Sequence, residues 1–130
     1  MLSGIKTHRW IEANNGIGRK VSIVTGASRG ICKAIALKLA SFGAKLAVNY
    51  VAIEVSNKVD ADDLVETITH LGGEAMVVEA DMRDSEAVKT MLEQVTDRWS
   101  KIDILVNNAG INIDTLLMEE HFLKSVVVGR

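Results

Sequence analysis

The residues that could do chemistry in this chain lie where short apolar runs give way to glycine, asparagine or aspartate. The first such place is residues 21–32, VSIVTGASRGIC, in which β-branched residues lead into a loop containing Gly26 and Gly30. β-branched residues suit a strand buried on both faces of a parallel sheet. Glycine allows a sharp turn and the close approach of a ligand, and a following helix presents unpaired N–H groups and its positive dipole end. The stretch therefore predicts a loop that binds an anion such as a pyrophosphate.

The elements that must position this loop follow from the hydrophobic pattern. Apolar runs predict strands at residues 20–24, 45–49, 75–80 and 102–106, and the stretches between them have helical spacing. The first helix should end at Gly43, the second should begin at Asp62 and end at Gly72, and the third should be capped by Asp84. The residues expected on their buried faces are Ile31, Ile35, Leu39 and Phe42, then Leu64, Ile68 and Leu71, then Val88, Met91, Leu92, Val95 and Trp99.

Strands that alternate with helices predict an α/β fold built from right-handed βαβ units around a parallel sheet, here with four strands and three crossovers. Residues 19–118 should form this domain. Residues 1–18 are expected to be a flexible leader, 51–58 a long connection and 119–130 a divergent tail, with a helical piece near 116–123. Ligands of such sheets bind at the carboxyl ends of the strands. The residues expected at those ends are Thr25 to Ile31, Asn49 and Tyr50, Asp81 and Met82, and Asn107 to Gly110.

Composition narrows the possible partners. The chain has 130 residues, 48% of them hydrophobic, and a formal net charge of −2. This provides no basic field for nucleic acid, and no apolar run approaches the roughly 18 residues of a membrane span. The single cysteine, Cys32, excludes an internal disulfide, and the three histidines are too scattered to suggest a metal site. We expect a cytoplasmic protein, or an organellar one if residues 1–18 act as a transit segment.

Two motifs at predicted strand ends resemble those of the short-chain dehydrogenase/reductase family. They are TGASRGI at residues 25–31 and NNAG at residues 107–110, and the segments KAIAL, VNY, LGGEA and ILVNNAGI are similar to the 3-oxoacyl-acyl-carrier-protein reductases of that family. The resemblance runs from about Lys20 to Met118. It implies the N-terminal half of a Rossmann-like, doubly wound parallel sheet with strand order 3-2-1-4, which would leave residues 102–106 as an open hydrophobic edge and the chain marginally stable.

The resemblance also implies a dinucleotide cofactor. An NAD site usually carries a carboxylate at the end of the second strand, whereas this chain has Asn49 and Tyr50 there, and Arg29 offers donors for a 2′-phosphate. NADP(H) is therefore expected rather than NAD(H), unless Arg29 is simply a solvated loop charge. By resemblance, Asp81 would bond the adenine amino group, although it could equally be a turn residue. The full set of expected binding residues is Gly26, Ser28, Arg29, Gly30, Ile31, Asn49, Tyr50, Asp81, Met82, Asn108, Ala109 and Gly110.

Cys32 departs from the family pattern, because it stands where a third glycine would let the helix pack closely on strand and cofactor. Its side chain is expected to crowd the diphosphate and weaken binding without abolishing it. A packed, inert thiol is the simpler interpretation. A reactive thiolate at a helix N-terminus is the alternative.

The catalytic residues of the family are absent from these 130 residues. A Tyr-x-x-x-Lys helix is required, whereas the only tyrosine, Tyr50, is followed four positions later by Glu54. We therefore expect the cofactor-binding portion of an oxidoreductase that, when intact, reduces a carbonyl such as a 3-oxoacyl thioester to an alcohol. The alternatives are a non-catalytic nucleotide-binding module that pairs with a homologous full-length subunit, and a non-functional reading frame.

Overall fold

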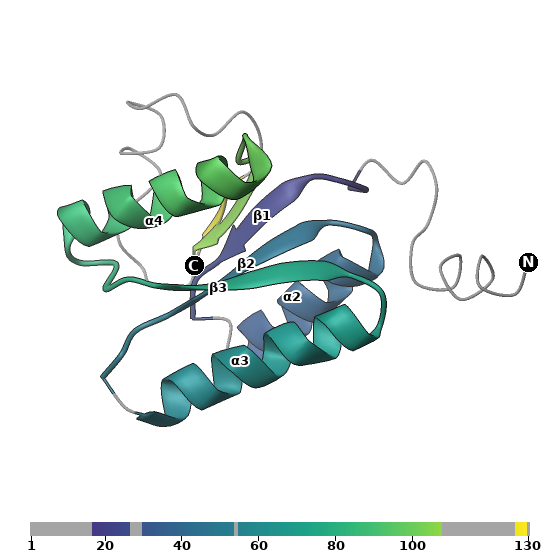
Figure 1. Cartoon of the computed structure of the whole chain (residues 1–130), viewed down its shortest axis with the longest axis horizontal. Helices are drawn as coiled ribbons and strands as arrows, with labels where there is room; N and C mark the ends of the chain where they lie inside the picture. The colour runs from purple at the N-terminus through teal and green to yellow at the C-terminus, as the bar shows by residue number, and fades with distance from the viewer. Residues whose placement is uncertain (1–16, 27–29, 54, 108–126, 130) are drawn as a thin grey trace, which may run out of the picture.

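The computed structural model of the chain describes residues 17–26, 30–53, 55–107 and 127–129 (Figure 1). Within these residues, no helix combines the length and apolar character needed to cross a membrane. The elements are β1 (Val21–Val24), α2 (Gly30–Ser41), β2 (Lys45–Tyr50), α3 (Val55–His70), β3 (Glu74–Glu79), α4 (Ser85–Trp99), β4 (Ile104–Asn107) and β5 (Val127–Gly129).

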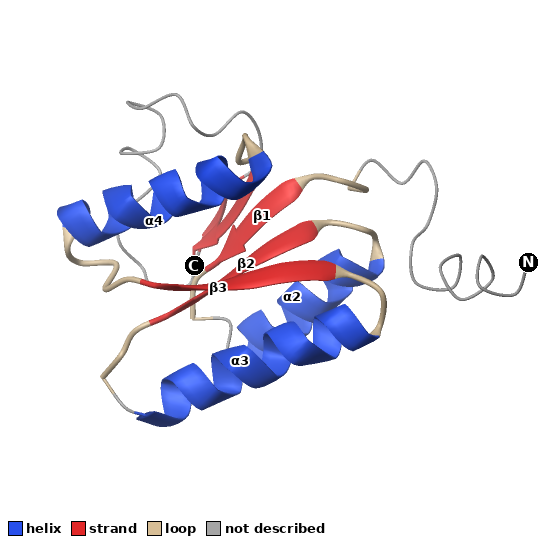
Figure 2. Ribbon diagram, in the orientation of Figure 1, coloured by secondary structure: helices blue, strands red, loops and turns tan. Residues whose placement is uncertain are grey.

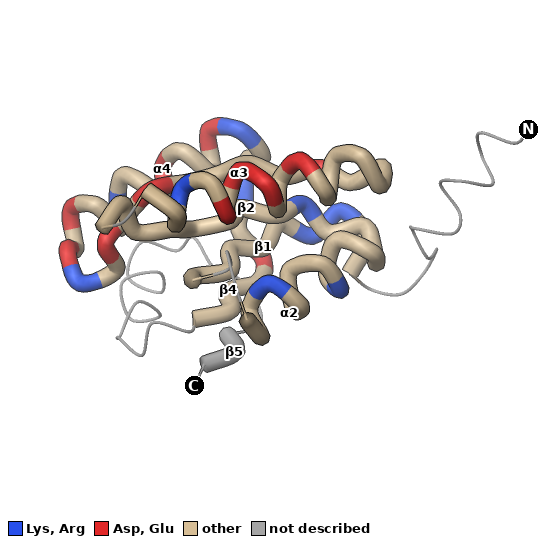
Figure 3. Tube along the Cα trace, turned by 90° about the horizontal axis from the view of Figure 1, so that it is seen from below, with Lys and Arg blue, Asp and Glu red and all other residues tan. Residues whose placement is uncertain are grey.

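The strands form one parallel sheet in the order β3-β2-β1-β4-β5. Helices α2 and α3 cover one face of the sheet and α4 covers the other (Figure 2). Strands β1 and β4 carry no charged residue, and the charges lie mainly on the helices and the turns around them (Figure 3). This arrangement confirms the predicted α/β class, the parallel pairing and the order 3-2-1-4 of the first four strands.

The predicted open edge at β4 is wrong for the described residues. β5 pairs with β4 in parallel, with Leu105 opposite Val127 and Val106 opposite Val128. Consecutive valines favour extended backbone, and pairing satisfies hydrogen-bonding groups that an open strand would expose. The sequence prediction missed this strand because three residues are too short to show a pattern.

Helix α4 follows its sequence prediction. Asp84 caps it, because the Asp84 carboxylate accepts hydrogen bonds from the backbone N–H groups of Glu86 (3.0 Å) and Ala87 (3.4 Å). The predicted apolar face is buried in the core between α4 and the sheet, together with Ile23 and Leu105. Its buried residues are Val88, Met91, Leu92, Val95 and Trp99.

Helix α2 turns a different face to the sheet than predicted. The buried positions are Cys32, Ala36 and Ala40, whereas Ile31 is 72% exposed. Small side chains let the helix approach the sheet closely, and the larger residues Ile35 and Leu39 then pack at the sides. The sequence prediction favoured large apolar side chains and therefore selected the helix face next to the one that is buried.

Helix α3 begins seven residues before the predicted start at Asp62. Its first turns contact little of the sheet, since Val55 is 83% and Val59 50% exposed, so the segment lacks a buried apolar period. Leu71, predicted to be buried, follows the helix end and is 48% exposed. The residues that do anchor α3 in the core are Ala61, Leu64 and Ile68.

A buried carboxylate secures the start of β1 against the segment before β4. Asp103 donates its backbone N–H to the Val21 carbonyl (2.8 Å), and its carboxylate accepts the Val21 N–H (2.9 Å) and lies 3.0 Å from the Lys101 ammonium. Burial raises the pKa of Asp103, but the Val21 and Lys101 donors lower it by more, so the net pKa lies below its usual value. The negative charge of Asp103 therefore contributes to folding stability.

We expect Asp103→Ala to lower the free energy of unfolding at pH 7 by about 1–3 kcal/mol, because the buried Val21 N–H loses its acceptor. Because folding lowers the pKa, the charge contributes fully above the unfolded pKa near 4, and this contribution is lost as pH falls through the folded pKa. Urea unfolding at pH 7 and pH 3 checks this, with Asp97→Ala on the exposed side of α4 as control. If Asp103→Ala lowered the free energy of unfolding equally at pH 7 and pH 3, the proposed contribution of the Asp103 charge would be contradicted.

Candidate cofactor site

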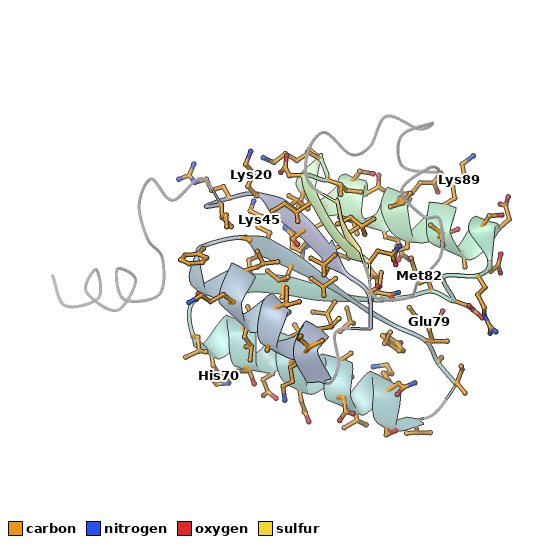
Figure 4. The ribbon with its side chains drawn as sticks, turned by 180° about the vertical axis from the view of Figure 1, so that it is seen from behind. Lys20, Lys45, His70, Glu79, Met82 and Lys89 are labelled. Carbon is orange, nitrogen blue, oxygen red and sulfur yellow. The ribbon has the colours of Figure 1, made fainter. Side chains whose placement is uncertain are left out.

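The parallel strands bring the predicted binding residues to one edge of the sheet. Lys20 and Lys45 lie at the amino edge, and Glu79 and Met82 lie at the opposite, carboxyl edge (Figure 4). Of the predicted set, the structure places at this carboxyl edge Gly26, Gly30, Ile31, Asn49, Tyr50, Asp81 and Met82. Ser28, Arg29, Asn108, Ala109 and Gly110 lie outside the described residues.

The loop after β1 leaves the sheet in a fixed direction. The backbone N–H of Thr25 donates to the Val106 carbonyl (3.0 Å), and the Thr25 hydroxyl lies 3.3 Å from the same oxygen. Gly26 and Gly30 then have φ values of 62° and 66°, in the left-handed region that only glycine adopts readily. A Cβ placed on Gly30 would meet no atom of the described residues within 4 Å. The described part of the chain therefore leaves open space beside the backbone where α2 begins.

The beginning of α2 favours an anion in that space. The first N–H groups of a helix have no partner within it, and the dipole adds partial positive charge. The first turn of α2 contains no acidic residue to compete for these groups. The exposed Ile31 side chain lies next to Gly30 and supplies apolar surface beside the polar groups. This end of α2 suits the binding of a diphosphate that carries larger organic groups, because it combines backbone donors, open space and a flanking apolar side chain.

Cys32 is turned into the core. It is 2% exposed and belongs to the same buried cluster as Val24, Ala36 and Tyr50. Such burial suits a small packed side chain and disfavours the reactive-thiolate alternative, since reactive cysteines are partly exposed. The expected crowding of a bound diphosphate by Cys32 stays a prediction.

The two residues at the end of β2 point to opposite faces of the sheet. Asn49 is 1% exposed, and its amide nitrogen lies 3.3 Å from the Ala80 carbonyl oxygen, 3.4 Å from that of Val78 and 3.5 Å from the Met91 sulfur on α4. Tyr50 instead belongs to the cluster on the α2 face. The Asn49 side chain is therefore engaged in the core, and Tyr50 is the one on the face that carries α2.

The end of β3 presents a carboxylate that is already paired. Asp81 accepts the backbone N–H (2.9 Å) and Nε–H (3.1 Å) of Arg83 on Oδ1, and Nη2–H (2.9 Å) on Oδ2. The hydrogen bonds from Arg83 lower the pKa of Asp81 to about 2. Asp81 thus begins a turn, which was one of the two roles expected for it, and its contact with adenine stays a prediction because Oδ2 still has acceptor capacity. Met82 beside it is 5% exposed.

Two residues at this edge were not singled out from the sequence. Arg83 could have been found, because a cation stands two positions after the expected adenine acceptor. Glu79 could not, because its relevance depends on register. It is exposed and lies opposite Tyr50 in the β2–β3 pairing, so a carboxylate is present one strand away from the expected ribose position.

A parallel sheet in this order, with glycines between β1 and α2, is the Rossmann-like α/β architecture that often binds dinucleotides. The sequence profile of the short chain dehydrogenase family matches residues 20–127, and the chain belongs to this family. The match confirms the family predicted from the TGASRGI and NNAG motifs and extends beyond Met118, where the resemblance had been expected to end.

Individual relatives agree with this assignment. The chain is 46% identical over 99 residues to a 3-oxoacyl-[acyl-carrier-protein] reductase of Synechocystis, covering 76% of this chain and 38% of that protein. A Burkholderia cenocepacia short chain dehydrogenase in complex with NADP is similar at 42% identity and a TM-score of 0.65, over 75% of this chain and 38% of that one. A Burkholderia phymatum relative in complex with NAD is similar at 29% identity and the same TM-score, over 73% and 32% of the two chains. The chain thus spans less than two fifths of the length of these proteins.

Proposed function

We propose that this chain is the NADP(H)-binding portion of a short-chain oxidoreductase. The observation that carries the proposal is the open space that the described residues leave at Gly30, the first residue of α2, where the helix begins with N–H groups that have no partner within the helix. A dinucleotide fits that position, because its diphosphate needs backbone donors and room to approach the main chain.

Each part of the cofactor has candidate partners along the carboxyl edge. The loop from Gly26 to Gly30 would bind the diphosphate, and Arg29 within it would bind the 2′-phosphate. Tyr50 would flank that ribose, and Asp81 would accept from the adenine amino group with Met82 beside it. Residues 108–110 would line the adenosine ribose. When bound, the nicotinamide supplies hydride transfer to or from a substrate carbon.

The reaction of a whole protein containing this chain would be reduction of a carbonyl to an alcohol. The similarity to a 3-oxoacyl-[acyl-carrier-protein] reductase supports a 3-oxoacyl thioester as its substrate. General-acid chemistry on such a carbonyl needs a phenol whose pKa is lowered by a nearby cation, and the sequence contains no Tyr-x-x-x-Lys pair. We therefore propose that the 130-residue chain binds cofactor without turning it over.

A second candidate is a non-catalytic nucleotide-binding module that pairs with a full-length relative. Mixing the chain with such a relative and measuring association by size-exclusion chromatography separates the two functions. Co-elution supports the module, and separate elution supports an isolated portion of an enzyme.

We expect the purified chain to bind NADPH and 2′-phospho-AMP saturably and NADH more weakly, as measured by calorimetry. Arg29→Ala should reduce affinity for the two 2′-phosphorylated ligands by about 10-fold, since a charge-assisted hydrogen bond contributes roughly 1.5–3 kcal/mol. Arg98→Ala on α4 removes an equal charge away from the loop and should leave binding unchanged. Absence of binding in the folded chain, or turnover of acetoacetyl thioesters with NADPH, would contradict the proposal.

A further inference from the structure

The pairing between Asp81 and Arg83 leaves the carboxylate with limited acceptor capacity. An ionised carboxylate has about four acceptor positions, two on each oxygen. Both positions of Oδ1 are taken by the backbone N–H and Nε–H of Arg83, and one position of Oδ2 is taken by Nη2–H. Counted over the described residues, one acceptor position, on Oδ2, is left for a ligand.

The surrounding backbone holds this carboxylate in place. Before it, the Ala80 N–H donates to the Tyr50 carbonyl (3.0 Å) and the Ala80 carbonyl accepts from the Asn49 amide (3.3 Å). After it, the Asp84 N–H donates to the Asp81 carbonyl (2.9 Å). The Asp81 side chain and the backbone on both sides are therefore constrained before any ligand arrives, which lowers the entropic cost of binding.

The geometry of the Arg83 contact orients the Asp81 carboxylate more strongly than an ordinary surface ion pair would. The Arg83 side chain is 76% exposed, and most exposed pairs contribute little because water and salt screen them. Here the guanidinium uses two nitrogens on the two carboxylate oxygens, and the Arg83 N–H adds a third contact. A planar fork restricts the orientation of a carboxylate, whereas a point charge does not.

We propose that Arg83 is a positioning residue for base recognition, which fixes Asp81 so that its one remaining acceptor selects a purine with a 6-amino group. This inference rests on the proposed function of the site as a dinucleotide site. Adenine carries a 6-amino donor that matches the acceptor on Oδ2. Hypoxanthine carries a 6-oxo acceptor at the same place, which would face the carboxylate with like partial charge. A site built to accept a hydrogen bond rejects the analogue that cannot donate one.

Binding of matched nucleotides tests the selection. We expect the 130-residue chain to bind 2′-phospho-AMP about 10- to 100-fold more tightly than 2′-phospho-IMP, the range for a hydrogen bond to a charged group. Arg83→Gln should weaken adenine binding by about 3- to 10-fold and leave hypoxanthine binding unchanged, whereas a structural defect would weaken both. Arg83→Lys should restore part of the selectivity, because it returns the charge without the fork. Arg98→Gln is the matched control on α4.

A second measurement tests the contact between Asp81 and Arg83 in the absence of a ligand. The Asp81 carboxyl carbon, followed by NMR, should titrate with a pKa of about 2 in the unaltered chain, rise towards the usual value in Arg83→Gln and stay low in Arg98→Gln. An ordinary pKa in the unaltered chain overturns the pairing. Retained selectivity in Arg83→Gln overturns the positioning role while the dinucleotide site stands. Failure of the unaltered chain to bind either nucleotide overturns the proposed function, and the inference with it.

Discussion

Replacing Asn49 with aspartate is expected to destabilise the chain and to leave its relative affinity for NADPH and NADH unchanged. The sequence alone suggests the opposite, because a carboxylate near the end of β2 would accept from the ribose 2′-hydroxyl of NAD. In the structure the Asn49 amide is buried, and its nitrogen faces the carbonyl oxygens of Val78 and Ala80. Asn49→Asp would put a carboxylate oxygen against both. Burying such a charge without a donor costs several kcal/mol, so we expect a loss of about 3 kcal/mol or more.

Tyr50→Asp provides the comparison, because it introduces the same charge one residue later on the face that carries α2. This variant loses packing, yet it should gain NADH affinity relative to NADPH, since its carboxylate would lie on the same side of the sheet as α2 and the proposed diphosphate site. Urea unfolding and calorimetric titration with both cofactors measure the two effects. A stable Asn49→Asp chain with improved NADH binding would show that Asn49 faces the ribose after all.

The direction of these two side chains is the part of the site that the sequence could not predict. Successive residues of a strand point to opposite faces, so a shift of one residue exchanges them. A half-exposed strand reveals its register by alternating apolar and polar residues. β2 is apolar on both faces, because helices cover the sheet on both sides, and its sequence KLAVNY shows no alternation. The strand itself was predictable, and the roles of Asn49 and Tyr50 were not.

The helices show the same dependence on exposure. Helix α4 has a polar outer face and an Asp84 cap, so its buried stripe and its start could be predicted. Helix α2 buries Cys32, Ala36 and Ala40, and small residues carry too weak a hydrophobic signal to outweigh Ile31 nearby. The Arg83 contact with Asp81 is local and was visible in principle. Its significance depends on the parallel sheet, which brings Asp81 to the same edge as the glycine loop.

Gly30 is the residue whose substitution should reduce cofactor binding most. Its φ of 66° is unfavourable for other residues, so Gly30→Ala should cost about 1–2 kcal/mol of stability. The added Cβ would meet no atom of the described chain within 4 Å, so the fold itself can accommodate it. It would instead occupy the space proposed for the diphosphate. Overpacking of this kind costs about 1–3 kcal/mol, which corresponds to roughly a 5- to 150-fold loss of NADPH affinity.

Gly43→Ala separates backbone strain from loss of the site. Gly43 follows the other end of α2 and has a φ of 93°, so alanine there is also strained, but at the amino edge of the sheet, away from the loop. We expect both variants to lower the midpoint of urea unfolding and only Gly30→Ala to lose binding of NADPH and 2′-phospho-AMP. Equal binding by the two variants would mean that the diphosphate does not approach the main chain at Gly30. Equal loss by both would mean that the position of α2, rather than the open space beside its first residue, determines affinity.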